Sequence, residues 1–266
     1  MVKIGYICPT YKEPELHAYT LKALNTFFRT TAGGVAIVVD DCSDDWQKYQ
    51  PAIMKTPLFD GQEVHSYHFD HWGGLTRSWN KGIEIAASVG CDYICPANND
   101  IVFSDRWYEG LLHALENGYH LAGPVSNAPG ITAQGRAEVW QYFKDYNVSD
   151  DMAAINRVAA KLRKDFSGVV VESHVNGFFQ MGKTKSFEEG RYDKDHYYCP
   201  RNDVNSKGKP NPTPLMTLNE DELQGRWTKK GWKFAVVPSS FVFHYRAVTR
   251  GGKHRKGKWY RMSGQS

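Results

Sequence analysis

Carboxylate and amide side chains gather in four short clusters along the chain: Asp40-Asp41, Asp44-Asp45, Asn98-Asn99-Asp100 and Asn219-Glu220-Asp221. Each cluster alone has a structural explanation, because Asp and Asn are common in turns and at helix N-termini. Together they indicate a shared chemistry, since oxygen ligands of this kind suit Mg²⁺ or Mn²⁺, which bind through few carboxylates plus substrate phosphates. The clusters therefore predict a divalent metal ion completed by a nucleoside diphosphate.

The elements that must position these clusters alternate between strand-like and helix-like patterns. We expect buried strands at 3–8, 35–39, 63–69, 92–97 and 120–125, and helices at 16–27 and 75–86, with a further helix starting at Ser104-Asp105. Such alternation predicts a mostly parallel sheet flanked by helices, with a functional crevice at the carboxyl ends of the strands. Asp40 or Asp41 and Asp100 follow such strands, so they would share that crevice, where like charges call for a cation.

The second half of the chain departs from this alternation. Apolar residues recur on one helical face, which predicts a helical insertion packed beside the sheet: Met152, Ile155, Ala159, Leu162 and Phe166. Residues 199–214 are rich in Pro, Asn, Lys and Gly and predict a mobile loop. The basic residues from 250 onward are either a solvated tail or a flexible lid for an anionic ligand, the donor diphosphate or a membrane-linked acceptor phosphate.

Composition narrows the class of protein. The 266 residues include 33 Lys and Arg against 29 Asp and Glu, a net charge of +4 that gives little support to nucleic-acid binding. The 5 cysteines lack the spacing of a zinc site, which favours reduced thiols. No apolar stretch approaches the roughly 18 residues of a membrane span. We therefore expect a cytoplasmic protein without a transmembrane segment, which could contact a membrane peripherally through its basic tail.

The order of motifs resembles the family 2 glycosyltransferases with the GT-A fold, particularly the rhamnosyltransferase-like members. The matching segments are CPTYKEPE, VVDDCSDD, GGLTRSWNKGIEIA, NND, NGFFQMGKTKSFEEGRYD and NEDELQGRWTKKGWKFAVVPSSFVFHY. They run in the family's order from residue 3 to about residue 250. The resemblance implies a single GT-A domain over 1–266, with a nucleotide-sugar-binding half at 1–125, an acceptor-binding half at 126–249 and a basic flexible tail at 250–266.

The same resemblance implies a donor site in the first half. The positions that match the nucleoside loop, the base-recognising acid and the lining of the nucleotide diphosphate are Pro9, Thr10 and Glu13, then Asp40 or Asp41, then Gly74, Arg77 and Asn80. The triplet Asn98-Asn99-Asp100 stands where the family has its D-x-D motif. Because Asn98 departs from the two-acid form, Asp100 is the expected metal carboxylate, with Asn98 and Asn99 beside the donor.

The acceptor chemistry is implied by the later motifs. Glu220-Asp221 resembles the family's E-D pair, in which the Asp is the general base, and Asn176 and Gly177 are expected to support the acceptor site. His244 matches a metal or diphosphate ligand, although a buried core histidine at a strand end is an alternative. The implied enzyme is an inverting, metal-dependent glycosyltransferase of the hexosyltransferase type, acting in glycan biosynthesis. Its substrates would be a nucleoside diphosphate sugar and the hydroxyl of a saccharide or glycan acceptor.

Three other classes of protein compete with this interpretation. A catalytically inactive relative that binds a nucleotide or a glycan is compatible with the same motifs. A sugar-1-phosphate nucleotidyltransferase would need a Gly-rich loop after the first strand, where this chain has PTYKEPEL. A nucleic-acid binder that used the basic tail would be expected to carry a reading motif, and none is recognisable.

Overall fold

The computed structural model describes residues 2–11, 14–56, 59–136, 139, 151–192 and 219–245. The predicted donor residue Glu13, the loop at 199–214 and the basic tail at 250–266 lie outside these residues.

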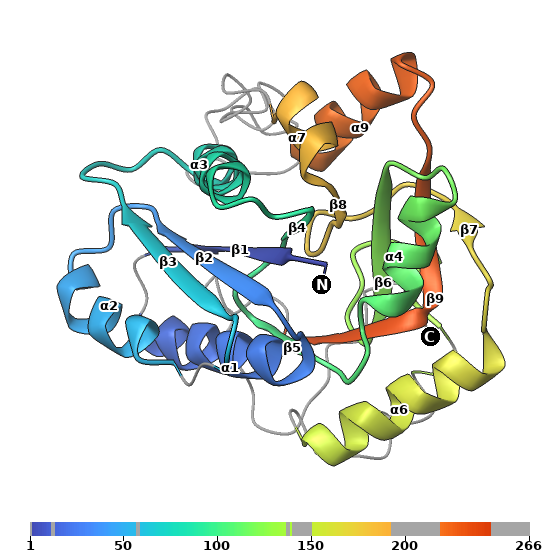
Figure 1. The fold of residues 1–266 in the computed structure, drawn as a ribbon, viewed down its shortest axis with the longest axis horizontal. Coiled ribbons are helices and arrows are strands. Elements are labelled where there is room, and N and C mark those ends of the chain that lie inside the picture. Colours follow the sequence, from blue (N-terminus) through green and yellow to red (C-terminus); the bar gives the residue numbers. More distant parts are fainter. Residues whose placement is uncertain are drawn as a thin grey trace, which may run out of the picture.

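The larger of two sheets has the strand order β3-β2-β1-β4-β8 (Figure 1). Four of its strands are parallel: β1 (Ile4–Thr10), β2 (Gly34–Asp40), β3 (Glu63–His68) and β4 (Tyr93–Pro96). The short β8 (Gly182–Lys183) pairs with β4 in the antiparallel sense. The carboxyl ends of the parallel strands therefore lie along one edge of the sheet.

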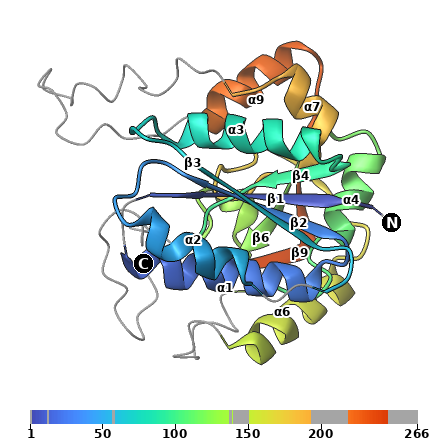
Figure 2. The same cartoon turned by 60° about the vertical axis from the view of Figure 1, so that its left-hand side comes forward.

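Helices cover both faces of this sheet (Figures 1 and 2). On one face, α1 (Pro14–Thr30) and α2 (Trp46–Met54) contribute side chains to a core that includes Tyr6 and Phe27. On the other face, α3 (Leu75–Ser88) contributes Ile83 to a separate core around Ile7, and α7 (Thr184–Glu189) and α9 (Asn219–Lys229) lie beyond it. Adjacent strand residues such as Tyr6 and Ile7 pack into opposite cores because successive side chains in a strand point to opposite faces.

The smaller sheet has the order β5-β9-β6, with β7 also paired to β9. Its strands are β5 (Ile101–Phe103), β6 (Leu121–Ser126), β7 (Val171–Glu172) and β9 (Phe234–His244). The remaining elements are α4 (Glu109–Glu116), the short 3₁₀ helix η1 (Thr132–Gln134) and α6 (Met152–Asp165). The apolar face of α6 packs against β9. The chain crosses from the larger to the smaller sheet at residues 97–100, between β4 and β5.

The predicted α/β class is confirmed, with a mostly parallel sheet flanked by helices and a helical insertion, but some details differ. The helix expected from Ser104-Asp105 begins only at Glu109, because the intervening residues form a turn in which Arg106 has a left-handed φ of 58°. The helix α2 was not predicted, since it contains Pro51 and buries only Trp46 and Ile53. No helix among the described residues is long and apolar enough to span a bilayer.

Candidate active site

Asp40 ends β2 directly beside Thr10, its neighbour in register at the end of β1. The Asp40 carboxylate is fully buried. Its Oδ1 accepts hydrogen bonds from Thr10 Oγ1 (2.9 Å) and Ser43 Oγ (2.6 Å), and its Oδ2 accepts from Ser43 N (2.8 Å) and lies 2.8 Å from His68 Nδ1. A carboxylate has about four lone-pair sites, so these contacts occupy Asp40 completely.

Asp41 faces the start of α3 instead. Its Oδ1 accepts from Gly73 N (2.9 Å) and Arg77 Nη2 (2.5 Å), and its Oδ2 accepts from Gly74 N (2.5 Å). Oδ2 thus retains accepting capacity, which favours Asp41 over Asp40 as the acid that a ligand could reach. The structure brings together the predicted residues Asp41, Gly74 and Arg77, at a helix N-terminus that favours anions.

An aromatic ring and two glycines surround Arg77. The guanidinium lies over the Phe69 ring, with its Cζ 3.7 Å from the ring centroid. A Cβ on Gly73 would lie 2.0 Å from Arg77 Nε, so a side chain there would displace the guanidinium from this position. Gly74 has a φ of 84°, a left-handed conformation that glycine adopts without strain.

Three other predicted donor residues lie away from the start of α3. Pro9 pairs with Val39 within the sheet. Asn80 lies further along α3, where its Nδ2 donates to Tyr192 O (2.8 Å) and its buried Oδ1 has no hydrogen-bond partner in the described part of the chain. Asn99 is buried and donates through Nδ2 to Thr20 Oγ1 on α1 (3.2 Å), so its side chain faces that helix.

Asp100 and His244 meet at the junction of the two sheets. His244 ends β9 and pairs in register with Ile101, the first residue of β5. The carboxylate of Asp100 is buried, and neither of its oxygens accepts a hydrogen bond in the described part of the chain. Its Oδ1 lies 3.2 Å from His244 Nε2, and Asn98 Nδ2 lies 3.2 Å from the same nitrogen. The structure thus brings Asn98, Asp100 and His244 together.

The hydrogen bonding of His244 identifies which ring nitrogen carries the proton. Its Nδ1 lies 3.1 Å from Ala128 O, and a carbonyl oxygen can only accept, so Nδ1 is the donor. In the neutral ring Nε2 is then an acceptor, which Asn98 Nδ2 faces at 3.2 Å. The same Nε2 lies 3.2 Å from Oδ1 of Asp100, a carboxylate that accepts no hydrogen bond in the described part of the chain. The close approach of two acceptors, Nε2 and Oδ1, is favourable when a proton or a metal cation lies between them. Core packing, in which Phe178 stacks on the His244 ring at 5.0 Å, does not explain the unpartnered carboxylate.

This donor set suits a hard divalent cation that keeps positions for a substrate. No group of three His, Cys, Asp or Glu side chains that could hold a metal ion occurs in the described ranges. One carboxylate and one imidazole are too few for a closed protein site, whereas Mg²⁺ is commonly bound by one or two protein groups plus substrate phosphates. The residues therefore fit a metal ion that binds together with a diphosphate.

Two glutamines hold the backbone beside the residues that were predicted to support an acceptor. Val175 N donates to Gln224 Oε1 (2.9 Å), Gln224 Nε2 donates to Val175 O (2.8 Å), and Asn176 N donates to Gln134 Oε1 (2.9 Å). These bonds hold the backbone of Val175 and Asn176 between η1 and α9. Sequence reasoning missed both glutamines, because an isolated Gln in a loop or a helix carries no recognisable motif.

Asn176, Gly177 and Glu220 lie together above this frame. Asn176 Nδ2 is 3.5 Å from Glu220 Oε1, and a Cβ on Gly177 would lie 2.8 Å from Glu220 Oε2. Burial raises the pKa of Glu220 above its usual value, and the charge of Asp221 acts in the same direction. This carboxyl is therefore easier to protonate than an exposed glutamate.

Asp221, the predicted base, is more accessible than its neighbour. It lies in the first turn of α9, where the positive end of the helix favours a carboxylate. Its side chain is 48% exposed, and Oδ1 lies 2.9 Å from Nε2 of His174. His174 was not identified from the sequence, since it lies 47 positions from Asp221 and belongs to no motif of its own.

The predicted acceptor residues adjoin the Asp100 site through Phe178. Asn98 N donates to Phe178 O (2.8 Å), and Phe178 N donates to Asn176 Oδ1 (3.2 Å). On the other side, Tyr6 of β1 donates through its hydroxyl to Asn98 O (2.8 Å). The segment at 97–100 thus connects the parallel sheet, the Asp100–His244 pair and the predicted acceptor residues.

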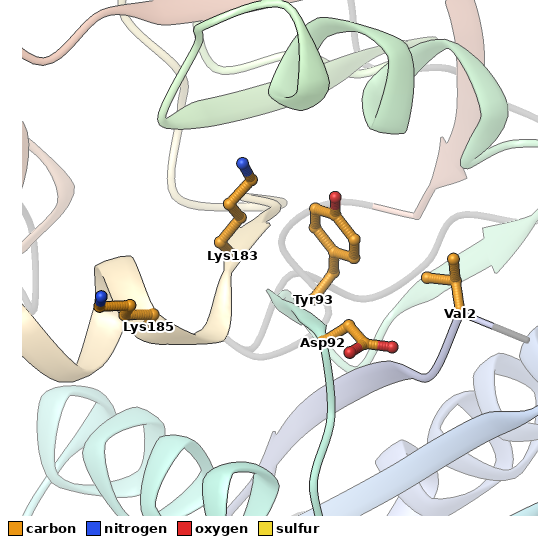
Figure 3. A pocket seen from close by; sticks show the side chains of 5 residues that line it. All are labelled: Val2, Asp92, Tyr93, Lys183 and Lys185. Carbon is orange, nitrogen blue, oxygen red and sulfur yellow. The ribbon is translucent and has the colours of Figure 1, made fainter.

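A cavity of about 630 Å³ lies at the opposite end of β4 (Figure 3). It is lined by Val2, Asp92, Tyr93, Lys183 and Lys185. Asp92 and Tyr93 are at the amino end of β4, whereas Asn98 to Asp100 follow its carboxyl end. None of the residues predicted for the site lines this cavity, which lies apart from the candidate active site.

Comparison with solved structures supports the class of fold. The chain resembles the crystal structure of GalNAc-T7 with UDP, GalNAc and Mn²⁺, with a TM-score of 0.59 and 13% sequence identity. The match covers 92% of this chain and 44% of the GalNAc-T7 chain, so the protein spans less than half the length of that relative. At this identity the likeness shows the fold alone, which is the GT-A fold.

Comparison with protein families then gives the family. Residues 6–191 match the model of glycosyl transferase family 2, and the chain belongs to that family. A search among curated proteins found no match.

Proposed function

We propose that the protein is an inverting, metal-dependent glycosyltransferase of the hexosyltransferase type. It would move a sugar from a nucleoside diphosphate sugar to the hydroxyl of a saccharide or glycan acceptor. Family membership supports glycosyl transfer in general. The observation that carries the proposal is the buried carboxylate of Asp100, which has no hydrogen-bond partner in the described part of the chain and faces His244 Nε2.

Asp100 and His244 would hold Mn²⁺ or Mg²⁺, with Asn98 beside them. When bound, the ion neutralises negative charge on the departing diphosphate. Arg77 and the N-terminus of α3 provide positive potential for the donor, and Asp41 orients Arg77 through their ion pair. The donor-site assignments of Pro9, Thr10, Glu13, Asn80 and Asn99 stay predictions.

Asp221 would act as the general base. It accepts the proton of the acceptor hydroxyl while that oxygen forms a bond to the anomeric carbon and the bond to the donor diphosphate breaks. Attack from the face opposite the leaving group inverts the anomeric configuration. The exposure of Asp221 supports this role because an acceptor can reach it, whereas Glu220, whose pKa is raised, is suited to support Asn176 and Gly177.

A thermal-shift screen tests the proposal without knowledge of the acceptor. UDP, GDP, dTDP, CDP and ADP are added separately, each with and without Mn²⁺. We expect one nucleotide to raise the Tm, and to do so only with metal, because a ligand at about 100 times its Kd adds about 2.7 kcal/mol to the folded state. Absence of a shift under every condition would overturn the donor and metal assignments. Metal-dependent binding without sugar transfer would instead support a catalytically inactive relative.

Cellular location and membrane contact belong to the same proposal. A location in the cytoplasm fits the four described cysteines, which are free. Peripheral membrane contact through the basic tail stays a prediction, because residues 250–266 lie outside the described part of the chain.

A further inference from the structure

We propose that Asn127 is a positioning residue for His244, whose backbone it holds through its side-chain amide so that the imidazole stays beside Asp100. The inference rests on the proposed function, because the proposed metal site is what makes the exact position of His244 matter. Asn127 directly follows β6 and is buried. The argument starts from the two hydrogen bonds between this amide and the backbone of His244.

The backbone N–H and C=O of His244 point away from β5. Tyr245 N donates to Asp100 O (3.0 Å). Hydrogen-bonded and non-hydrogen-bonded pairs alternate between antiparallel strands, so the next pair, His244 with Ile101, exchanges no hydrogen bonds. The polar backbone groups of His244 therefore face the side of β6. That strand ends at Ser126, so groups beyond its end must satisfy them.

The side chain of Asn127 supplies both partners. Its Oδ1 accepts from His244 N (2.8 Å), and its Nδ2 donates to His244 O (3.1 Å). A backbone N–H only donates and a backbone carbonyl only accepts, so these partners identify which end of the amide is which. Ser126 Oγ also donates to Oδ1 (3.3 Å). The amide thus binds the end of β9 as the backbone of a neighbouring strand would.

The residue that follows Asn127 holds the imidazole ring. Ala128 O accepts from Nδ1 of the ring (3.1 Å), and Asn98 Nδ2 faces Nε2 at 3.2 Å. Both contacts indicate the same tautomer, with the proton on Nδ1. A histidine that binds a metal commonly donates its other ring N–H to a backbone carbonyl, which fixes the ring orientation. Two consecutive residues, Asn127 and Ala128, therefore fix the backbone and the ring of His244.

A positioning role and a purely structural role predict different results. If Asn127 only completed the sheet, its removal would lower stability, because buried backbone groups would lose their partners, but the folded variant would bind metal normally. If Asn127 positions His244, the folded variant binds metal more weakly. Partners that orient metal ligands typically contribute roughly 10- to 100-fold to metal affinity.

Calorimetric titration of Mn²⁺ tests the proposal. It is made in the presence of UDP, GDP, dTDP, CDP or ADP, whichever raises the Tm in the thermal-shift screen, and a titration into nucleotide alone is subtracted. We expect Asn127→Ala to raise the Kd of Mn²⁺ roughly tenfold or more. Asn127→Ser should lose less affinity, because its hydroxyl can replace one of the two bonds.

The matched control is Asn156→Ala on α6. Asn156 likewise makes two hydrogen bonds with one residue, since its Oδ1 accepts from Asp105 N (2.9 Å) and its Nδ2 donates to Asp105 Oδ2 (2.7 Å). This asparagine lies outside the candidate active site, so its removal should leave the Kd of Mn²⁺ as in the wild type. Urea denaturation shows that each variant is folded under the conditions of the titration.

The possible results separate this inference from the proposed function. A wild-type Kd in Asn127→Ala, or an equal loss in Asn156→Ala, would overturn the positioning role while His244→Ala still abolishes Mn²⁺ binding. Normal Mn²⁺ binding in His244→Ala would overturn the metal assignment, and the positioning role with it. If Asn127→Ala does not fold, the comparison is made with Asn127→Ser, for which a wild-type Kd likewise overturns the positioning role.

A measurement without metal examines the same contacts. Long-range ¹H–¹⁵N correlation spectra, recorded at a pH where the imidazole is neutral, report which ring nitrogen carries the proton, and His244→Ala identifies the signals of His244. We expect the Nδ1–H form in the wild type and a mixture of both forms in Asn127→Ala, since the released ring no longer meets Ala128 O. The Nε2–H form in the wild type, or spectra unchanged in Asn127→Ala, would overturn the proposal.

Discussion

Three buried aspartates that look alike in sequence have different surroundings. Asp40 is occupied by Thr10, Ser43 and His68. Asp41 is occupied by the start of α3 except at one lone-pair site. Asp100 accepts no hydrogen bond in the described part of the chain. Burying a carboxylate that accepts no hydrogen bond is costly, so among these three aspartates Asp100 would gain most from a nearby cation.

The first prediction concerns Asp100→Asn. We expect this variant to be at least as stable as the wild type without ligands, because it removes a buried charge that lacks hydrogen bonds. It should also lose the Mn²⁺-dependent part of the stabilisation by nucleotide. Both effects are measured as Tm with and without Mn²⁺ and nucleotide. A variant that keeps the metal-dependent shift would contradict the assignment of Asp100 as a ligand.

The second prediction concerns Asp221→Asn. The amide cannot accept the proton of an acceptor hydroxyl, so we expect turnover to fall by a factor of about 10² or more. Nucleotide binding, measured by calorimetry, should be unchanged because Asp221 lies with the acceptor residues and not at the start of α3. Turnover within tenfold of wild type would show that another group is the base.

At the scale of elements, α3 positions Arg77 through its packing on β1. Gly82 lies on the buried face of α3, where a Cβ would come within 2.2 Å of Ile7 Cγ2. The side chain of Ile7 is fully buried and β-branched, so it has little freedom to move away. The close approach of helix and strand therefore depends on glycine at this position.

The third prediction compares two glycine substitutions in helices. We expect Gly82→Ala to lower the free energy of unfolding by about 1–3 kcal/mol through overpacking against Ile7. Gly225→Ala on α9 is the matched control, because within the described residues no atom outside the nearby backbone of α9 lies within 4 Å of its added Cβ. Helix propensity should make that variant more stable by about 0.5–1 kcal/mol. Urea denaturation measures both values, and equal effects would contradict the steric argument.

At the scale of the whole molecule, the site exists because two sheets meet. The segment at 97–100 connects β4 of the larger sheet to β5 of the smaller sheet. Strand β9 pairs with β5 and places His244 beside Ile101. Residues from α9 and from the segment after β7 adjoin the same junction. Ionisable groups buried at this junction should therefore affect the free energy of unfolding of the whole protein.

The fourth prediction is a pH dependence of unfolding that arises from Glu220. Its folded-state pKa is raised by burial, so the folded protein binds this proton more tightly than the unfolded chain does. The contribution of Glu220 to stability is therefore fully present below the unfolded pKa of about 4.3, and it is lost as pH rises through the folded pKa. Glu220→Gln cannot ionise, so its stability relative to wild type should increase over that interval and then level off. Urea unfolding across a pH series measures this, and a difference independent of pH would contradict it.

Much of the fold could be predicted from the sequence because its signals are local. The alternation of apolar runs indicated β1, β2, β3, β4 and β6, and the spacing of apolar residues from Met152 to Phe166 indicated α6. Where local signals were weak or misleading, as in α2 with its internal Pro51 or in the turn before α4, the prediction failed. The order of the motifs was enough to indicate the family, since motif order is a property of the chain and not of its packing.

The tertiary structure alone decided which chemical groups meet. The sequence could place Asp40 and Asp41 at a strand end, but it could not distinguish the occupied Asp40 from Asp41. Through the family resemblance it indicated Asp100 and His244 as metal ligands from two distant motifs, and the pairing of β5 with β9 places them 3.2 Å apart. It gave no indication of His174, whose contact with Asp221 depends on backbone bonds to β9 and α9. Local patterns depend on residues a few positions apart, whereas side-chain partners depend on how distant elements pack.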